Sequence, residues 1–337
     1  MFFKILLGGF VIGSTLFLIG GAAGGWWAYQ KFIQPGSFDQ PVTITIERGS
    51  NIRSISEILL YNGIIDNPSY IYLFQIGGRV TEQAANLKAG EYEIPAHASM
   101  QDVLDLLESG KVIQRNITVR EGLTSYEILL LLSEHSGLQP SRIEPLAEGT
   151  LLPETYSYSK GDAVIDIVQR MEKSMQETLD ILWEKRAENL PIKTKEEALI
   201  LASIIEKETA VPSERKDVAG VFINRLRKGM LLQTDPTVIY AINMGKNENN
   251  GQGPLGRRLL KKDLTYDSPY NTYVYAGLPP GPICNPGYDS IEAALNPGEH
   301  NYIYFVADGS GGHAFAKTLA EHNRNVANWR KIRKNQK

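Results

Sequence analysis

The sequence predicts an α+β protein built from a long apolar N-terminal helix, a small β/α module and a larger mixed α/β domain. Three observations support this: an uncharged N-terminal run, a segment where strand-like alternation precedes helical spacing, and a C-terminal half of helical stretches and Asn/Tyr/Pro/Gly-rich loops. The chain has 337 residues, enough for about two globular domains and an accessory segment. The predicted parts are an N-terminal segment at 1–30, a linker at 31–41, the module at 42–115, a connecting helical part at 116–190 and the core at 191–337.

The N-terminal segment is predicted to be a transmembrane helix. The run from Ile5 to Tyr29 contains no charged residue and is longer than the about 20 residues that a bilayer core requires. Trp26 and Trp27 stand where an aromatic belt would lie, and Lys4 favours an orientation with the N-terminus inside. We therefore expect a single-pass protein of the cytoplasmic (inner) membrane with its bulk on the extracytoplasmic side. A cleaved signal peptide is the alternative, although its apolar part would be unusually long.

The linker and the module follow from local patterns. "QPGSFDQP" consists of turn formers without periodicity, whereas "VTITIERG" alternates as a half-buried strand does. Ser99 is a plausible N-cap for a helix that Gly110 ends. Strand, turn and helix recur in "QRNITVREGLTSYEILLLL", and the stretch from Glu144 to Asn189 is expected to be mostly helical, with "LLPETYSYSKG" as a loop.

The core begins with a helix signature. Thr194 and Glu197 form a T-x-x-E pattern before an apolar run, which predicts a helix from Lys195 to about Ala210 that Pro212 prevents from continuing. Further on, "YIYFVADGSGGHAF" predicts two strands joined by a glycine turn rather than a phosphate-binding loop.

Two glutamates of this helix differ in their predicted surroundings. Glu208 continues the apolar stripe of Leu201 in the final turn, whereas Glu206 points away and is expected to be solvated or salt-bridged. Burial and the negative end of the helix dipole would both raise the pKa of Glu208, as a general acid requires. A structural Glu208 paired with Arg215 or Arg225 is the alternative, and helix geometry alone leaves both open.

Several blocks of the sequence resemble one enzyme family. "ASIIEKETAVPSERKDVAGVFINRLRKGMLLQTDPTVIYA", "SPYNTYVYAGLPPGPICNPG", "SIEAALNP" and "YIYFVADGSGGHAF" together resemble the endolytic murein transglycosylases of the MltG/YceG type. The resemblance is dense from about Leu199 onward and collinear upstream, where it implies a membrane anchor and a LysM-like module at 42–115. In that family the second Glu of the E-K-E-T block is the catalytic acid, which maps to Glu208.

The resemblance also implies a reaction and a partner. The reaction is cleavage of the β-1,4 bond between N-acetylmuramic acid and N-acetylglucosamine within peptidoglycan strands, leaving a 1,6-anhydro end. In the family this activity is thought to end nascent strands near the synthases, so a penicillin-binding protein is an expected partner. The candidate substrate-binding residues, with hydroxyl, amide, phenol or imidazole groups suited to sugars, are Thr209, Gln233, Asn271, Tyr273 and His313.

Other residues are assigned structural roles or left as alternatives. Asp235 is expected to cap the helix that begins at Pro236. As a second carboxylate, Asp235 or Asp217 would instead support a true hydrolase. A non-catalytic, membrane-anchored glycan-binding scaffold that uses the LysM-like module is the third alternative.

Composition argues against several other classes. No cofactor or metal is expected, because the five His residues do not have zinc-ligand spacing. Cys284, the single cysteine, lies in the loop "GPICNPG" and is interpreted as structural. A net charge of −3 predicts no nucleic-acid footprint, and the basic end "WRKIRKNQK" is interpreted as a solvated tail.

Overall fold

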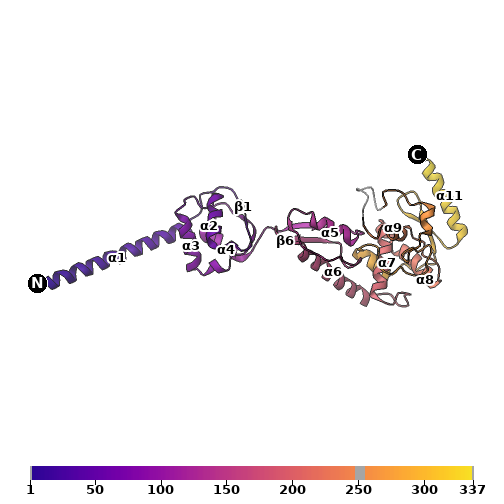
Figure 1. Ribbon diagram of the computed structural model, residues 1–337, viewed down its shortest axis with the longest axis horizontal. Helices are drawn as coiled ribbons and strands as arrows, with labels where there is room; N and C mark the ends of the chain where they lie inside the picture. The colour runs from indigo at the N-terminus through magenta and orange to yellow at the C-terminus, as the bar shows by residue number, and fades with distance from the viewer. Residues whose placement is uncertain (1, 247–254, 336–337) are drawn as a thin grey trace. The chain divides into compact units, whose positions relative to one another are not determined.

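The computed structural model describes residues 2–246 and 255–335, without the side chains of 2–14, 16 and 335. The chain divides into two compact units, Met1–Arg115 with Ser159–Gly161 (unit 1) and Asn116–Tyr158 with Asp162–Lys337 (unit 2) (Figure 1). Both units combine helices with short strands, so the predicted α+β class is confirmed.

Unit 1 is built on an antiparallel strand pair covered by helices. β1 and β2 pair in the register Ile44↔Tyr92, and both residues are buried in the core of the unit. The elements of unit 1, in chain order, are α1 (Phe2–Ile33), β1 (Val42–Ile46), α2 (Ile52–Tyr61), α3 (Tyr70–Val80), the 3-10 turn Gln83–Ala85, β2 (Gly90–Ile94) and α4 (Met100–Ser109).

The caps of α4 are those that the sequence predicts. Ser99 accepts a hydrogen bond from the Asp102 backbone N–H, and Gly110 ends the helix in the left-handed conformation. The helix α3 was not predicted. A Cβ on Gly77 would meet the Phe32 ring at 2.2 Å, so this glycine serves close packing, which outweighs its low helix propensity. The LysM-like assignment of this module stays a prediction.

The N-terminal helix α1 extends to Ile33, beyond the predicted segment boundary. Its last turn belongs to the core of unit 1, because Phe32 is buried there against α3. Trp27 contacts the ring of Tyr70 with centroids 6.4 Å apart. Within the part of the chain that the structure describes, no helix has both the length and the hydropathy of a membrane span. The structure does not describe the side chains of residues 5–14 and 16, which form part of the predicted span.

Unit 2 contains the elements that follow α4. Its strands form two-stranded pairs, β3 with β5, β4 parallel to β6, and β7 antiparallel to β8. The bounds are β3 (Arg115–Thr118), α5 (Ser125–Ser133), β4 (Leu138–Gln139), β5 (Thr155–Tyr158), β6 (Asp162–Ala163), α6 (Val164–Glu184), α7 (Lys195–Glu208), the turn Pro212–Glu214, α8 (Arg215–Arg227), α9 (Asp235–Asn243), the turn Lys261–Thr265, α10 (Tyr288–Leu295), β7 (Tyr304–Ala307), β8 (His313–Ala316) and α11 (Leu319–Asn335).

The prediction for residues 144–189 was partly wrong. Only α6 is a long helix there, and the expected loop contains strand β5. Tyr156 and Tyr158 are buried while Thr155 and Ser157 are exposed, which is the alternation of a strand. The strand escaped prediction because its partner β3 lies far away in sequence.

The helix α7 is the central element of unit 2. It packs against α6, α8, α9 and α10, which Figure 1 shows in part as the group of α7, α8 and α9. One core cluster contains Leu201 of α7, Phe222 of α8 and Ile291 of α10. The hairpin of β7 and β8 is confirmed, and Gly309 and Gly311 have the positive φ values of 92° and 101° in its turn.

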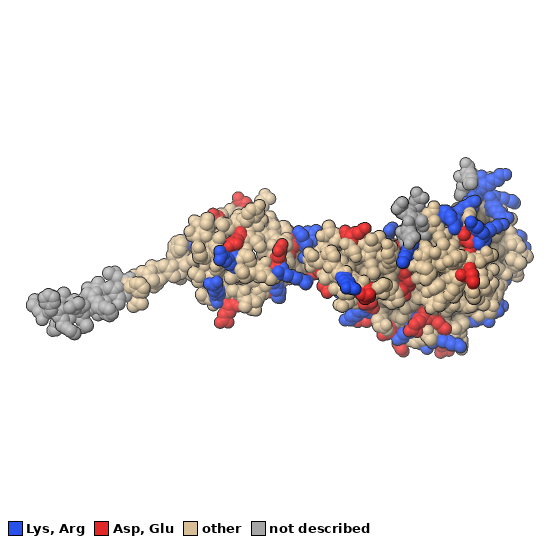
Figure 2. Space-filling model, in the orientation of Figure 1, with Lys and Arg blue, Asp and Glu red and all other residues tan. Residues whose placement is uncertain are grey.

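The basic C-terminal residues lie on α11. Arg330, Lys331, Arg333 and Lys334 are all exposed, and Figure 2 shows Lys and Arg side chains gathered over this helix. Positive charges near a helix C-terminus interact favourably with the helix dipole, which gives this cluster a structural explanation.

Candidate active site

Glu208 is the last residue of α7, so the fold of this helix sets its position. Thr194 caps the start of α7 by accepting a hydrogen bond from the Glu197 backbone N–H. Residues 200–205 are all buried, which holds α7 on every side. Thr209 adopts an extended conformation and ends the helix, within two residues of the predicted end.

Glu208 is half-buried, and one oxygen of its carboxyl group is hydrogen-bonded to a buried threonine. The Thr234 hydroxyl group donates a hydrogen bond to Glu208 Oε1. Burial raises the pKa of Glu208 to about 7, and this hydrogen bond acts in the opposite direction. Glu208 is therefore a carboxyl group that is partly protonated at neutral pH, as general acid catalysis requires.

Three ionisable side chains act on Glu208 from different elements. Asp235 raises its pKa further, whereas His313 and Arg225 lower it. The alternative of a structural ion pair is not what the described residues show. Arg215 pairs with other carboxylates, and Arg225 donates to the backbone oxygens of residues 232 and 303.

Tyr273 lies in a loop that contacts Asp235, and Gln233 directly precedes Thr234 in the chain. The Tyr273 hydroxyl donates to Asp235 Oδ1 over 2.6 Å, and burial together with this bond raises the pKa of Tyr273. Gln233 is exposed and has a positive φ of 50°, a conformation that costs energy for a residue with a Cβ. Its backbone N–H donates to the Thr272 carbonyl over 3.1 Å. Sugar contacts by Gln233 and Tyr273 stay predictions.

Asn271 has its side chain committed to the protein. It is fully buried, and its Nδ2 donates to the carbonyls of Leu264 and Tyr266 at 3.1 and 2.8 Å. Its Oδ1 accepts the backbone N–H of Tyr273 at 2.9 Å. Asn271 therefore shapes the loop that carries Thr272 and Tyr273, and a sugar contact by Asn271 stays a prediction.

The remaining two candidates also have internal partners. Thr209 is buried, and its hydroxyl accepts the Val211 backbone N–H over 3.1 Å. His313 Nδ1 lies 2.8 Å from Glu214 Oε2, and its backbone N–H donates to Glu214 Oε1 over 2.9 Å. His313 acts electrostatically on Glu208, so it belongs to the surroundings of the candidate acid. A sugar contact by Thr209 or His313 stays a prediction.

The predicted cap of α9 was one residue late. Asp235 is the first residue of the helix, and Thr234 occupies the cap position without a capping side-chain bond. The Thr234 hydroxyl donates its proton to Glu208. Sequence reasoning did not select Thr234 as a site residue. The contact joins residues on separate elements, and no local pattern indicates it.

Glu206 is salt-bridged, which is one of the two predicted alternatives. Its side chain is only 6% exposed, and Oε1 lies 3.4 Å from Arg215 Nη2. Its Oε2 accepts the backbone N–H of Gly287 over 3.0 Å. Arg215 also pairs with Glu121 and Asp289, at 3.2 and 3.0 Å. This network ties the second half of α7 to the start of α8 and to α10.

Cys284 and His322 have other partners in the described structure. Cys284 is fully buried, its Sγ lies 3.4 Å from the Ser203 carbonyl, and burial raises the pKa of its thiol. His322 stacks on the ring of Tyr304. Across residues 2–246 and 255–335, no three His, Cys, Asp or Glu side chains converge as metal ligands.

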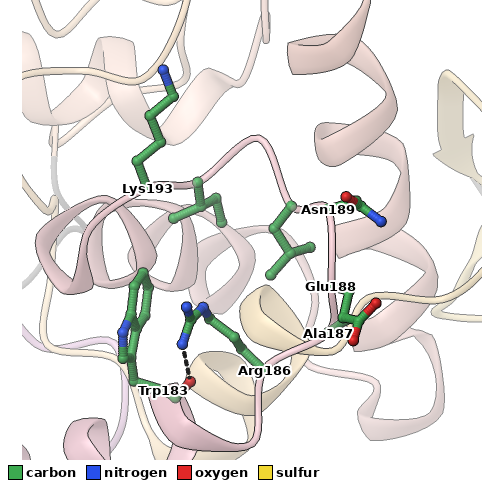
Figure 3. Close-up of a pocket in the computed structure, with 8 residues that line it drawn as sticks. Trp183, Arg186, Ala187, Glu188, Asn189 and Lys193 are labelled. Atoms are coloured by element: carbon green, nitrogen blue, oxygen red, sulfur yellow. Dashed lines mark hydrogen bonds between the residues drawn. The ribbon is translucent and has the colours of Figure 1, made fainter.

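Several cavities open on unit 2, and two of them lie toward opposite ends of α7. A pocket of about 630 Å³ lies at the N-terminal end, and in Figure 3 Arg186 lies beside the Trp183 indole in it, 4.2 Å from the ring centre. A pocket of about 160 Å³ is lined by Lys207 of α7 and by Pro236 and Ile239 of α9, and Glu208, Thr234 and Asp235 are not among its lining residues.

Comparison with known proteins assigns the chain to a family. A model of the YceG-like family matches residues 44–328. The chain belongs to the YceG-like family. The resemblance inferred from the sequence blocks is thus confirmed, and Glu208, Thr234, Asp235 and Tyr273 all lie inside the YceG-like region.

Two relatives of this YceG-like chain carry the name endolytic murein transglycosylase. The Bacillus subtilis (strain 168) protein is 32% identical over 338 residues, covering 89% of each chain. The Streptococcus pneumoniae (strain ATCC BAA-255 / R6) protein is 29% identical and covers 94% of this chain, which spans only 64% of that relative's length. A solved yceG-like protein of Listeria monocytogenes is 31% identical and covers 85% of this chain and 99% of its own, with a TM-score of 0.47.

Proposed function

We propose that this protein is an endolytic peptidoglycan lytic transglycosylase that cleaves bonds between N-acetylmuramic acid and N-acetylglucosamine inside glycan strands. The observation that carries the proposal is Glu208, a carboxyl group whose pKa burial raises to about 7 at the position that the family resemblance assigns to the acid. The names of the Bacillus and Streptococcus relatives support peptidoglycan as the substrate.

In the proposed mechanism one carboxyl group acts twice. Protonated Glu208 gives its proton to the glycosidic oxygen, and the bond from that oxygen to C1 of the muramoyl sugar breaks with its electron pair on the oxygen. The C6 hydroxyl oxygen of the same sugar then bonds to C1, and its proton returns to the Glu208 carboxylate. The products are a 1,6-anhydro end and a free N-acetylglucosamine hydroxyl. No water is consumed, so no second carboxylate is required to activate one.

A hydrolase is the second candidate, because Asp235 acts electrostatically on Glu208. In such an enzyme Asp235 would activate water or attack the sugar. Asp235 Oδ1 already accepts a hydrogen bond from Tyr273, which makes it less available to a water molecule or a sugar and favours the transglycosylase. Asp217 is less suited to this role, because it lies 3.9 Å from His300 and is not among the groups that act electrostatically on Glu208.

The products of nascent, uncrosslinked glycan should distinguish these candidates. The purified chain lacking residues 1–25, which keeps the part of α1 that packs on unit 1, is expected to release fragments that end in 1,6-anhydro-N-acetylmuramic acid, because the nucleophile belongs to the substrate. Mass spectrometry of the ends checks this. Reducing ends with one added water would indicate the hydrolase, and binding to sacculi without any soluble release would indicate the scaffold.

We also propose that residues 1–30 anchor the protein in the cytoplasmic membrane, with unit 2 outside. The uncharged run from Ile5 to Tyr29 supports this. In this location the enzyme would end nascent strands beside a penicillin-binding protein.

Cell fractionation tests the anchoring. The full chain is expected in the membrane fraction after a carbonate wash, whereas a chain whose residues 1–25 are replaced by a cleavable secretion signal is expected in the soluble extracytoplasmic fraction. Equal release of both chains by the wash would contradict the anchor.

A further inference from the structure

We propose that Thr234 is a positioning residue of this reaction, whose hydroxyl group fixes which Glu208 oxygen carries the transferred proton. The inference rests on the proposed role of Glu208. It starts from the hydrogen bonds of three buried threonines, which are 2%, 0% and 1% exposed and are Thr234, Thr237 and Thr272.

The directions of these hydrogen bonds follow from donor counting. The Thr237 hydroxyl donates to the Thr234 carbonyl over 2.7 Å, so its one proton is used. The 2.9 Å contact between the hydroxyls of Thr237 and Thr272 must then be donated by Thr272. Thr272 Oγ1 in turn accepts the Thr234 backbone N–H over 3.1 Å. The backbone of Thr234 is thus held in a closed ring of bonds.

This ring leaves the Thr234 hydroxyl with a single task. The ring does not use the hydroxyl proton, which is donated to Glu208 Oε1. When Glu208 is neutral, the oxygen that accepts this hydrogen bond is the carbonyl oxygen. The acid proton therefore lies on Oε2, the oxygen that Thr234 does not hold.

The same bond determines the return of the proton. In the carboxylate, a hydrogen bond donated to Oε1 makes that oxygen the weaker base. Oε2 is left as the stronger base and takes the proton from the C6 hydroxyl group. One oxygen then performs both transfers, so the glycosidic oxygen and the C6 oxygen meet the same atom in turn.

Other charged groups face Glu208 but do not make this choice. Asp235 of α9, His313 of β8 and Arg225 of α8 change its charge balance from a distance. Tyr273 reaches the site through its bond to Asp235. Among the described residues, Thr234 is the side chain that makes a hydrogen bond to a named oxygen of Glu208.

The test compares Thr234→Val, which keeps the shape and loses the donor, with Thr234→Ser, which keeps the donor. T234V is expected to lower kcat by about 10- to 100-fold, as expected for one lost hydrogen bond to a charged group, with little change in KM. The wild-type alkaline limb is expected near the Glu208 pKa of about 7. In T234V it should move to higher pH, because the lost bond holds this pKa down. T234S should restore kcat to within about threefold of the wild type and return the alkaline limb to its wild-type position.

Thr237→Val is the matched control, because it disturbs the threonine ring without removing a bond to Glu208. It is expected to lower the thermal midpoint and leave the alkaline limb in place. Wild-type kcat and pH limb in T234V, the same pH shift in T237V, or no rescue by T234S would each overturn the inference. Thr234→Ala replaces T234V if the latter does not fold. An active Glu208→Gln variant would instead refute the proposed function itself.

Discussion

Replacing Glu208 with Gln is expected to reduce the release of anhydro-ended glycans by about 10²- to 10⁴-fold, the range for loss of a general acid. Glutamine fills nearly the same space and its amide oxygen can accept the Thr234 hydrogen bond. It cannot supply or recover a proton in the pH range of the enzyme. The loss should appear in kcat, because the amide leaves the shape of the site in place. Release of anhydro ends from nascent glycan measures it.

The control separates lost chemistry from lost folding. Glu196→Gln makes the same change in the first turn of α7, at an exposed position, and is expected to leave activity unchanged. The folded-state pKa of Glu208 is raised to about 7. Its contribution to stability is therefore full at low pH and is lost as the pH rises through about 7. E208Q should accordingly be at least as stable as the wild type at pH 8. Retained activity in a folded E208Q protein would refute the assignment.

The position of Glu208 could be predicted because local signals determine it. The cap at Thr194 sets where α7 begins, and the apolar spacing that includes Leu201 sets the face on which Glu208 lies. The oxygen-specific contact from Thr234 could not be predicted in the same way. Thr234 lies 26 residues further along, and its orientation depends on the loop that Asn271 shapes.

The burial of Glu206 also could not be predicted from the local sequence. A helical projection separates it from the apolar stripe, yet its side chain is only 6% exposed. The groups that enclose it come from distant parts of the chain, since Arg215 bonds Glu121 and Asp289 at separations of 94 and 74 residues. α3 and β5 were missed for a related reason, because each depends on a tertiary partner that compensates for weak local propensity.

The second large effect is expected at this ion network. Replacing Arg215 with Met should lower the free energy of unfolding by about 3–5 kcal/mol, the cost of leaving a buried charge unpaired. The Arg215 side chain is 10% exposed and faces Glu206, which is 6% exposed, so water cannot replace the lost cation. Urea denaturation followed by tryptophan fluorescence measures the change.

Two further variants identify the cause. Removing both charges in Glu206→Gln with Arg215→Met should recover much of the loss, since an apolar or neutral pair avoids the buried charge. Lys216→Met breaks the neighbouring pair with Glu292, whose side chains are 51% and 34% exposed, and should cost less than about 1 kcal/mol. If R215M costs no more than K216M, or if the double variant is as unstable as R215M, the unpaired Glu206 charge is not what destabilises the protein.

Arg215 begins α8 directly after the turn that carries Glu214, the partner of His313. The network therefore also fixes the chain segment that leaves Glu208, and R215M should lower activity at temperatures where the fold survives.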